Sequence, residues 1–401
     1  MMILHLSDTH LGAAPYGLTI RYRDVYEAFL EAMEVGAREH VDVVVHCGDF
    51  FDTPNPPPEA YVVAAKALRK LRDRGIEVLI IAGQHDTPRR RSISPLKMLE
   101  SLGLVKYVAV DEVALWDVKG VKFVAVPHRA RSSLRKVSVP RGSVLMAHLL
   151  LKETGIPQYD ARAEDIPLGF KYVALGDYHK PLILRHRDGT PIAYPGSTEA
   201  LRRDEYVPEG RSVLLVDLSR DEPVIQKVRL RSPRPWIIGR FSRVNEAAGS
   251  IARRASEIVS RGLKQPLVYA ELLSEDASQL YAALDTLLRK GLIAYYRVEV
   301  ITRDVGAEEP TEVPEGVNLE AVVRELVEDE ELARRIIELV TAPSYDTVRK
   351  FVSDLLESEE LVKSLERLVS KILRPAPQRS SHGNASPLPG GSLRGLARFF
   401  R

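Results

Sequence analysis

The first 232 residues repeat one pattern, in which a short β-branched run ends in a polar cluster and an amphipathic stretch often follows. The runs begin at Met2, Val41, Val78, Val121, Val144 and Tyr172. Such an alternation is typical of buried strands in an α/β fold. We expect helices over about 21–39 and 58–74, and the runs at 191–194, 212–216 and 224–228 predict a second sheet that shares the same core. The pattern therefore constrains residues 1–232 to a sheet-based domain.

A chain of 401 residues is too long for one ordinary core, so further parts are expected. Residues 233–302 alternate strands and helices in the order βαβαβ, which predicts a small α+β module. An acidic, proline-containing linker is expected over 303–317, helices over 318–373, and a Pro-, Ser- and Gly-rich disordered tail over 374–401. The apolar stripe of the helices favours a partner surface, with packing of the helices on each other as the alternative.

Composition limits the function classes. The chain has 57 Lys and Arg against 55 Asp and Glu, so any nucleic-acid site must be a local patch. Its single cysteine, Cys47, forms no internal disulfide and is expected to be a buried, inert thiol. Neither a signal peptide nor about 18 consecutive apolar residues is visible. These features predict a soluble, cytoplasmic protein without a membrane association.

Five strand ends in the first domain carry side chains that bind metals: Asp8 and His10, Asp49, Gln84 to Asp86, His148, and Asp177 and His179. Polar groups at the ends of strands meet at one rim of an α/β sheet. Each residue alone would be an ordinary turn, cap or core residue. Together, their carboxylate, imidazole and amide groups suit Mn²⁺, Fe²⁺ or Zn²⁺, and their number suffices for two ions.

The order of these motifs (DxH, GD, GxHD, H and GxxH) resembles the calcineurin-like metallophosphoesterases. Three longer segments resemble the meiotic-recombination-eleven family of DNA double-strand-break repair nucleases: Leu6–Gly12, Gly48–Asp52 and Tyr194–Glu199. The resemblance implies a two-sheet sandwich flanked by helices over 1–232. It also implies a capping, DNA-binding domain over 233–302 and an ATPase-binding helical segment over 318–373.

The resemblance assigns roles to individual residues. It implies a first ion on Asp8, His10 and His179, a second ion on Gln84, His148 and Asp177, and a bridging carboxylate at Asp49. It further implies that His85 lies beside the scissile phosphate and is oriented by Asp86. Two metal ions held in this way activate a water molecule for attack on a phosphodiester, so no side chain acts as the nucleophile.

Two positions depart from the family pattern. Gln84 stands in place of the family's Asn, and Asp177 in place of its His. Both changes fall on the second ion and make its site harder and more negative, which favours Mn²⁺ or Mg²⁺ over zinc. Three interpretations stay open: a retuned active nuclease, a weak one whose second ion binds only at high concentration, and a scaffold without catalysis.

Several other segments carry hypotheses about partners. Arg89, Arg90 and Arg91 are either contacts to DNA phosphates or a solvated loop, and the pairs Arg129 and Arg131, and Arg202 and Arg203, are weaker versions of the same idea. The remaining histidines, among them His5, His46 and His128, match no motif and are expected to be structural or at the surface.

The end of the chain carries an aliphatic residue followed by two aromatics: Leu396, Phe399 and Phe400. This resembles the box with which proteins bind the sliding clamp, although Leu393 stands where the box has Gln. A tail that folds back on its own protein is the alternative.

These features predict a Mn²⁺-dependent DNA nuclease, a 3'-5' exonuclease or an endonuclease or both, in a double-strand-break repair complex. The implied partners are DNA, a coiled-coil ABC ATPase, the sliding clamp and a second copy of the chain, with 58–74 or 91–103 as the dimer interface. Two alternatives stay open. One is an inactive scaffold that links the ATPase and the clamp, and the other is a small-molecule phosphodiesterase or phosphatase.

Overall fold

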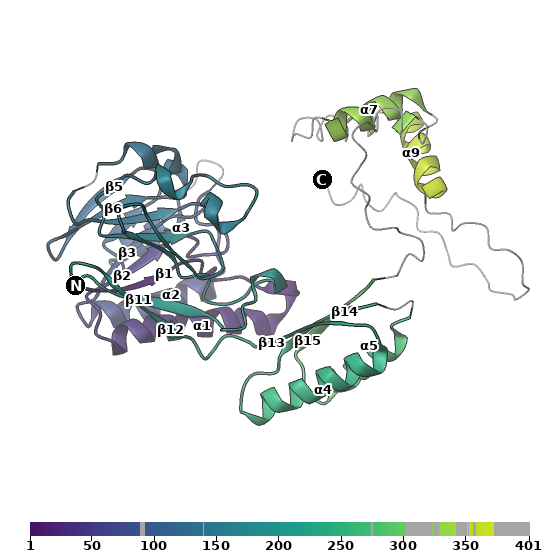
Figure 1. The fold of residues 1–401 in the computed structure, drawn as a ribbon, viewed down its shortest axis with the longest axis horizontal. Coiled ribbons are helices and arrows are strands. Elements are labelled where there is room, and N and C mark those ends of the chain that lie inside the picture. Colours follow the sequence, from purple (N-terminus) through teal and green to yellow (C-terminus); the bar gives the residue numbers. More distant parts are fainter. Residues whose placement is uncertain are drawn as a thin grey trace, which may run out of the picture. The chain divides into compact units, whose positions relative to one another are not determined.

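The computed structural model describes residues 1–88, 93–138, 140–273 and 276–301, and in the C-terminal part 323–324, 327, 329–341, 351, 353–355 and 358–372. The chain divides into two compact units, Met1–Arg303 and Asp304–Arg401, drawn in Figure 1. The expected linker at 303–317, the tail at 374–401 and Arg89 to Arg91 lie outside the described residues.

The first sheet has six strands in the order β12-β11-β1-β2-β3-β4. They are β1 (Met2–Leu6), β2 (Val43–Cys47), β3 (Glu77–Ile81), β4 (Tyr107–Ala109), β11 (Ser212–Asp217) and β12 (Val224–Arg229). β1 to β4 are parallel, and β11 runs antiparallel to β1. The helices of this half are α1 (Thr19–Arg38), α2 (Pro58–Arg72) and α3 (Pro95–Ser101). The helices predicted at about 21–39 and 58–74 are thus confirmed.

The second sheet also has six strands, in the order β5-β6-β7-β8-β10-β9. They are β5 (Ala114–Val118), β6 (Val121–Val126), β7 (Val144–His148), β8 (Tyr172–Gly176), β9 (Leu182–Arg185) and β10 (Pro191–Tyr194). The prediction that 191–194, 212–216 and 224–228 share the second sheet is wrong, since only β10 joins it. The chain returns instead to the open edge of β1, where β11 pairs Asp217 with Met2.

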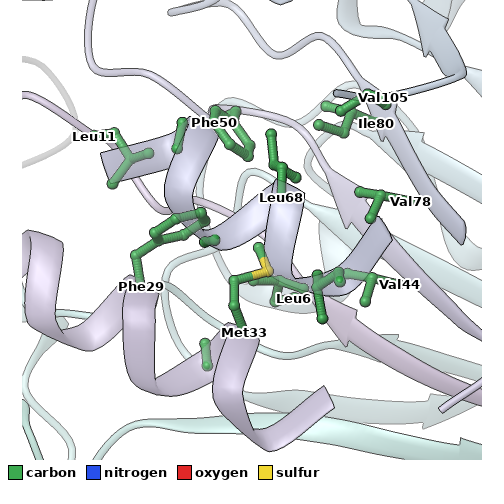
Figure 2. Close-up of a cluster of buried hydrophobic side chains, with 14 of the residues drawn as sticks. Leu6, Leu11, Phe29, Met33, Val44, Phe50, Leu68, Val78, Ile80 and Val105 are labelled. Atoms are coloured by element: carbon green, nitrogen blue, oxygen red, sulfur yellow. The ribbon is translucent and has the colours of Figure 1, made fainter. Parts of the chain in front are cut away.

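The inner strands of the first sheet, β1, β2, β3 and β11, are buried on both faces, which explains their nearly continuous apolar sequence, whereas the edge strand β12 is largely exposed. In β2, Val43 and Val45 point towards the second sheet, whereas Val44 packs with the helices. Figure 2 shows that helical layer, in which Phe29 and Met33 of α1 lie against Leu6 and Val44. Truncating a buried ring such as Phe29 to alanine is expected to cost about 3–5 kcal/mol.

A smaller three-stranded parallel sheet follows, with β13 (Trp236–Phe241), β14 (Leu267–Leu272) and β15 (Tyr295–Val300) in that order. The helices α4 (Val244–Ser260) and α5 (Ser278–Arg289) cover one face of it (Figure 1). The predicted helices and strands of this region are confirmed to within a few residues. Among the described residues, no α-helix packs on the other face of the sheet.

The second unit contains the described helices α7 (Glu330–Thr341) and α9 (Glu359–Ile372), whose Leu332, Ala333 and Leu361 share a small buried cluster. Five 3-10 turns complete the described elements: η1 (Pro15–Gly17), η2 (His128–Lys136), η3 (Lys152–Thr154), η4 (Ala163–Asp165) and η5 (Arg203–Glu205). Among the described helices, none has both the length and the apolarity that a membrane span needs.

Candidate metal centre

The polar strand ends of both sheets converge on one place. The loops after β1, β2, β3, β6 and β8 and the end of β7 bring together four overlapping groups of side chains, and within each group the possible ligand atoms lie within 4.8 Å of one another. These groups are Asp8, His10 and His179; His10, Asp52 and His85; Asp8, Asp49 and His148; and His128, His148 and Asp177. The sheets are thus packed so that ends of strands far apart in sequence form a single cluster.

The backbone at this cluster adopts an unusual conformation. Left-handed φ angles occur at Asp8 (53°), His10 (43°), Asp49 (52°) and Asp177 (91°). Only seven non-glycine residues in the described part of the chain have positive φ, and four of them are these. Such conformations cost of order 1–3 kcal/mol each and persist where the surrounding structure enforces them. The fold therefore holds these side chains in place at an energetic cost.

Two glycines allow the cluster to close. A Cβ atom at Gly48 would lie 2.1 Å from Nδ1 of His148, and one at Gly83 would lie 2.0 Å from Oδ1 of Asp49. Both distances are far below van der Waals contact, so no other residue fits without movement of its neighbour. These two glycines of the sequence motifs are needed for close approach of ligand and backbone.

Asp49 lies at the centre of the cluster and is fully buried. Its Oδ1 accepts a hydrogen bond from the backbone N–H of His85 at 2.9 Å. Its Oδ2 lies 3.6 Å from Nε2 of His148 and 3.8 Å from Nε2 of His10, and accepts no hydrogen bond from any described residue. Burial raises the pKa of Asp49, but the neighbouring His148 and His10 outweigh burial and hold that pKa well below its ordinary value.

The first group contains Asp8, His10 and His179. Nε2 of His10 and Nε2 of His179 are 3.2 Å apart, a distance that brings their nitrogens to one point. Two carboxylates that the sequence gave no role lie behind them: Asp52 Oδ1 is 3.2 Å from Nδ1 of His10, and Glu205 Oε1 is 3.0 Å from Nδ1 of His179. A carboxylate behind an imidazole fixes the ring and increases its basicity.

Asp52 had a signal in the sequence, since it ends the Gly48–Asp52 motif. Glu205 had none, because only the packing of η5 brings it to His179.

The second group contains Gln84, His148 and Asp177. Oε1 of Gln84 lies 2.8 Å from Nε2 of His148, and its Nε2 donates to Oδ1 of Asp177 at 2.9 Å. Nδ1 of the buried His148 donates to the carbonyl of Cys47 at 2.6 Å, so Nε2 is the nitrogen that faces the cluster. The longer Gln84 therefore reaches both other members of its group.

His128 belongs to the same group, which the sequence did not predict. It begins η2, and its backbone N–H donates to the carbonyl of Ala82 at 2.9 Å, next to the Gln84 loop. Its Nδ1 is buried and has no hydrogen-bond partner among the described residues. His128 was expected to be structural or at the surface, whereas the structure places it beside His148 and Asp177. No motif marked it, since only the loop after β6 brings it there.

The structure differs from the prediction that Asp86 orients His85. The buried Asp86 carboxylate instead accepts the backbone N–H groups of Gly83, Phe50 and Phe51 at 2.9–3.1 Å. Nδ1 of His85 lies 2.6 Å from the carbonyl oxygen of Asp52, which orients the ring. Asp86 therefore ties two loops of the cluster together, because an acceptor in this position satisfies amides that would otherwise be unpaired.

Those arginines considered for DNA contact that lie within the described residues make ion pairs. Arg129 pairs with Asp111 at 2.6 Å and Arg131 with Asp160 at 2.7 Å, whereas Arg203 pairs with Glu271 at 2.9 Å. Cys47 is buried as predicted, and burial raises the pKa of its thiol well above the ordinary value.

The donors of the cluster fit divalent cations. Imidazole nitrogens and carboxylate oxygens converge within ligand distance of one another, and a buried carboxylate oxygen lacks a donor. A buried anion without a partner is costly unless it binds a cation. The shared position of Asp49 between the histidines of both groups suits a carboxylate that is common to two ions.

Comparison with known proteins agrees with this geometry. The model of the calcineurin-like phosphoesterase family matches residues 1–205. A DNA double-strand break repair protein Mre11 from Sulfurisphaera tokodaii is 34% identical over 59% of this chain and 64% of its own length. The Mre11 proteins of Aeropyrum pernix (36% identical, 68% of this chain and 70% of that one) and Methanocaldococcus jannaschii (30%, 82% and 89%) are also similar.

Together, the fold, the cluster and these matches define a calcineurin-like phosphoesterase, a class whose chemistry implies divalent metal ions. The chain belongs to this family and, within it, to the Mre11 family of DNA double-strand break repair proteins. It spans 64% of the length of the first two relatives that it matches.

Proposed function

We propose that this protein is a metal-dependent DNA nuclease that acts in double-strand-break repair. The observation that carries the proposal is the buried Asp49, whose free carboxylate oxygen lies between histidines of two ligand groups. The names of the relatives support DNA as the substrate. The digestion is that of a 3'-5' exonuclease, an endonuclease or both.

The proposed centre holds two divalent ions, of which Mn²⁺ suits the mixed oxygen and nitrogen donors best. Asp8, His10 and His179 bind the first ion, Gln84, His148 and Asp177 bind the second, and Asp49 is shared. His128 is a further nitrogen ligand of the second ion, supported by its unpartnered Nδ1. Bound ions activate the attacking water and neutralise charge on the phosphate.

His85 provides the proton transfer in this proposal. The carbonyl of Asp52 can only accept a hydrogen bond, so Nδ1 of His85 carries a proton and donates it there. Nε2 is then the nitrogen left to face the substrate, and it gives a proton to the leaving oxygen when the ring carries a proton on both nitrogens, which leaves His85 neutral with its Nδ1 proton in place. The T-shaped contact of His85 with His10, at 4.8 Å between ring centroids, keeps the His85 ring beside the first group.

One observation favours a second candidate, a weak or inactive scaffold. Gln84 hydrogen-bonds both His148 and Asp177, and these contacts must break before the three residues share an ion. In this candidate, the chain links a coiled-coil ABC ATPase and the sliding clamp with little catalysis. Nothing in the described residues favours the small-molecule phosphatase of the sequence analysis.

The remaining assignments are part of the same proposal. Residues 233–302 cap the site and bind DNA, and the segment that contains α7 and α9 binds the ATPase. The chain forms a dimer through α2 or α3, and α2 offers the exposed Val62. Leu396, Phe399 and Phe400 bind the clamp, and Arg89 to Arg91 contact DNA phosphates.

A cleavage assay tests the nuclease proposal against the scaffold. The full chain is incubated with end-labelled linear DNA in Mn²⁺, Mg²⁺ or chelator, beside Asp49→Asn and the changes Gln84→Asn and Asp177→His, singly and combined. We expect cleavage in Mn²⁺, none in chelator or with Asp49→Asn, and little gain from the other changes. A silent natural chain with an active double variant would favour the scaffold, whereas silence of every protein in every metal would contradict a nuclease of this kind.

A further inference from the structure

The helix-free face of the small sheet borders a cavity of about 310 Å³ that is separate from the metal centre. Its walls come from η1 and η5 on one side and from β13, β14 and β15 on the other. The alternation of each strand places Ile237 and Val268 against the helices and leaves Trp236, Tyr269 and Tyr295 on the cavity side. A cavity of this size is at the lower end of the range for small-ligand sites, about 300–1,000 Å³.

Aromatic rings line the cavity. Tyr16 stacks on Tyr295 with ring centroids 5.1 Å apart and an angle of 22°, and its ring meets the edge of Trp236 at 6.1 Å. Tyr16 is 37% exposed, so part of its ring is open to another group. Its backbone φ of 61° lies in the left-handed region, which is rare for a bulky residue.

Two polar groups of the cavity lack partners. Trp236 is only 4% exposed, yet its indole N–H donates to no described residue. A buried donor of this kind normally has an acceptor. Arg297 lines the cavity from an exposed position and forms no ion pair with a described residue. Arg203 differs, because its guanidinium lies 3.9 Å above the Tyr269 ring and pairs with Glu271.

The cavity and the metal centre share their loops. The loop that carries His10 of the first ligand group continues into η1, which contains Tyr16. In η5, Arg203 lines the cavity, and Glu205 lies 3.0 Å from Nδ1 of His179. A strand bound at the metal centre thus has a second site within the same two segments.

We propose that this cavity holds one unpaired nucleotide of the DNA substrate. This inference rests on the proposed nuclease function. The base stacks on the open part of Tyr16, and Arg297 contacts the adjoining phosphate. A small shift of the Trp236 ring, whose N–H is buried in this structure, lets that N–H donate to an acceptor on the edge of the base. Asp204 and Glu299 also line the cavity, which disfavours a ligand with several negative charges and suits a neutral base with a single phosphate.

Binding measurements with chelator present test the proposal without cleavage. The full chain is titrated by fluorescence anisotropy with two labelled hairpin DNAs, one blunt and one with a short unpaired tail. The variants are Arg297→Ala and Trp236→Phe, and the second keeps an aromatic ring but removes the five-membered ring of the indole together with its N–H. Their matched controls are Arg253→Ala, another exposed arginine, and Trp116→Phe, at the other tryptophan of the chain.

The variants are expected to lose affinity for tailed DNA by about 5- to 150-fold, the range of one stacked base or good polar contact, with blunt DNA and both controls little changed. Equal losses on blunt and tailed DNA, or none on either, would overturn the proposal. A variant-sensitive site for free dAMP that tailed DNA does not compete for would also overturn it, since the occupant would then be a free nucleotide.

The nuclease function and the nucleotide site can be refuted independently. A natural chain that cuts DNA with Mn²⁺ while the cavity variants bind tailed DNA normally would leave the nuclease in place and remove the nucleotide site. A natural chain that neither binds nor cuts DNA would remove the proposed function, and the nucleotide site with it.

Discussion

Two buried clusters of charged groups in this protein are built in opposite ways. In the first, Asp24 accepts from Arg21 at 2.7 Å and from Arg234 at 2.6 and 3.0 Å, and Glu199 accepts from Arg21 at 3.1 Å. Every carboxylate there faces an arginine. In the metal centre, by contrast, Asp8 and Asp49 face histidines, and one oxygen of Asp49 has no donor.

The difference separates a structural cluster from a functional one. Burial raises the pKa of Asp24, but the hydrogen bond from Arg234 and the charge of Arg21 hold that pKa below its ordinary value, so the folded chain supplies its own counter-charge. This cluster joins α1 to the segment before β13 and helps to fix the small sheet on the first domain. The metal centre leaves its counter-charge to be supplied from solution.

Asp49→Asn gives the largest expected effect. The amide retains an oxygen for the His85 N–H but removes the charge shared by the two ligand groups, so cleavage of DNA in Mn²⁺ should fall about 1,000-fold or more. Thermal unfolding without metal should change little. A full rate in this variant would show that the cluster is not the catalytic centre.

Asp24→Ala should have the opposite effect and lower the stability of the fold. It leaves the buried Arg234 without its carboxylate partner and Arg21 with Glu199 alone, and breaking such a pair costs about 3–5 kcal/mol of the free energy of unfolding. Urea unfolding measures this loss, with the exposed Asp73→Ala as control. Equal stability of the two variants would refute the structural role of this cluster.

Binding of Mn²⁺ should stabilise the folded protein through the metal centre and not through the arginine cluster. With Mn²⁺ at about 100 times its dissociation constant, the free energy of unfolding should rise by about 2.7 kcal/mol. Asp49→Asn should abolish most of this rise, whereas a mild change in the arginine cluster, Glu199→Gln, should keep it. Calorimetry with and without Mn²⁺ provides the measurement, and an unchanged melting temperature of the natural chain would argue against the metal centre.

His128→Ala tests whether His128 belongs to the second ligand group. Loss of its nitrogen should weaken the second Mn²⁺ by about 10- to 100-fold and leave the first unchanged. Titration calorimetry resolves the two ions, with the exposed His40→Asn as the matched histidine control. Two unaltered affinities would return His128 to a purely structural role.

A histidine outside both clusters should make stability depend on pH. His5 is fully buried between Tyr172 and the carbonyl of Leu175, and burial lowers its pKa from 6.5 to about 3. The unfolded chain therefore binds a proton first, so stability is full above about pH 6.5 and falls by up to about 1.4 kcal/mol per pH unit down to about pH 3.

His5→Gln should flatten this part of the stability profile in urea unfolding between pH 7 and 4. An identical slope in the variant and the natural chain would assign the acid sensitivity to other groups.

Much of the fold was predictable because strands that are buried on both faces are apolar over most of their length, as in Val43 to Val45 of β2. The pairing of β11 and β12 with β1 was not predictable. Their sequences fit an edge of either sheet, and the choice depends on which edge the folded chain leaves open.

The sequence by itself determined which side chains are available for metal binding, since Asp8, His10, Asp49, His148 and His179 each follow or end a strand and such ends meet at one rim. The tertiary structure alone decided how these groups are used. The place of His128, the contacts of Asp86 with three backbone amides and the aromatic cavity at Tyr16 depend on loops from distant segments. Local patterning encodes strand ends, whereas packing in three dimensions sets which loops meet.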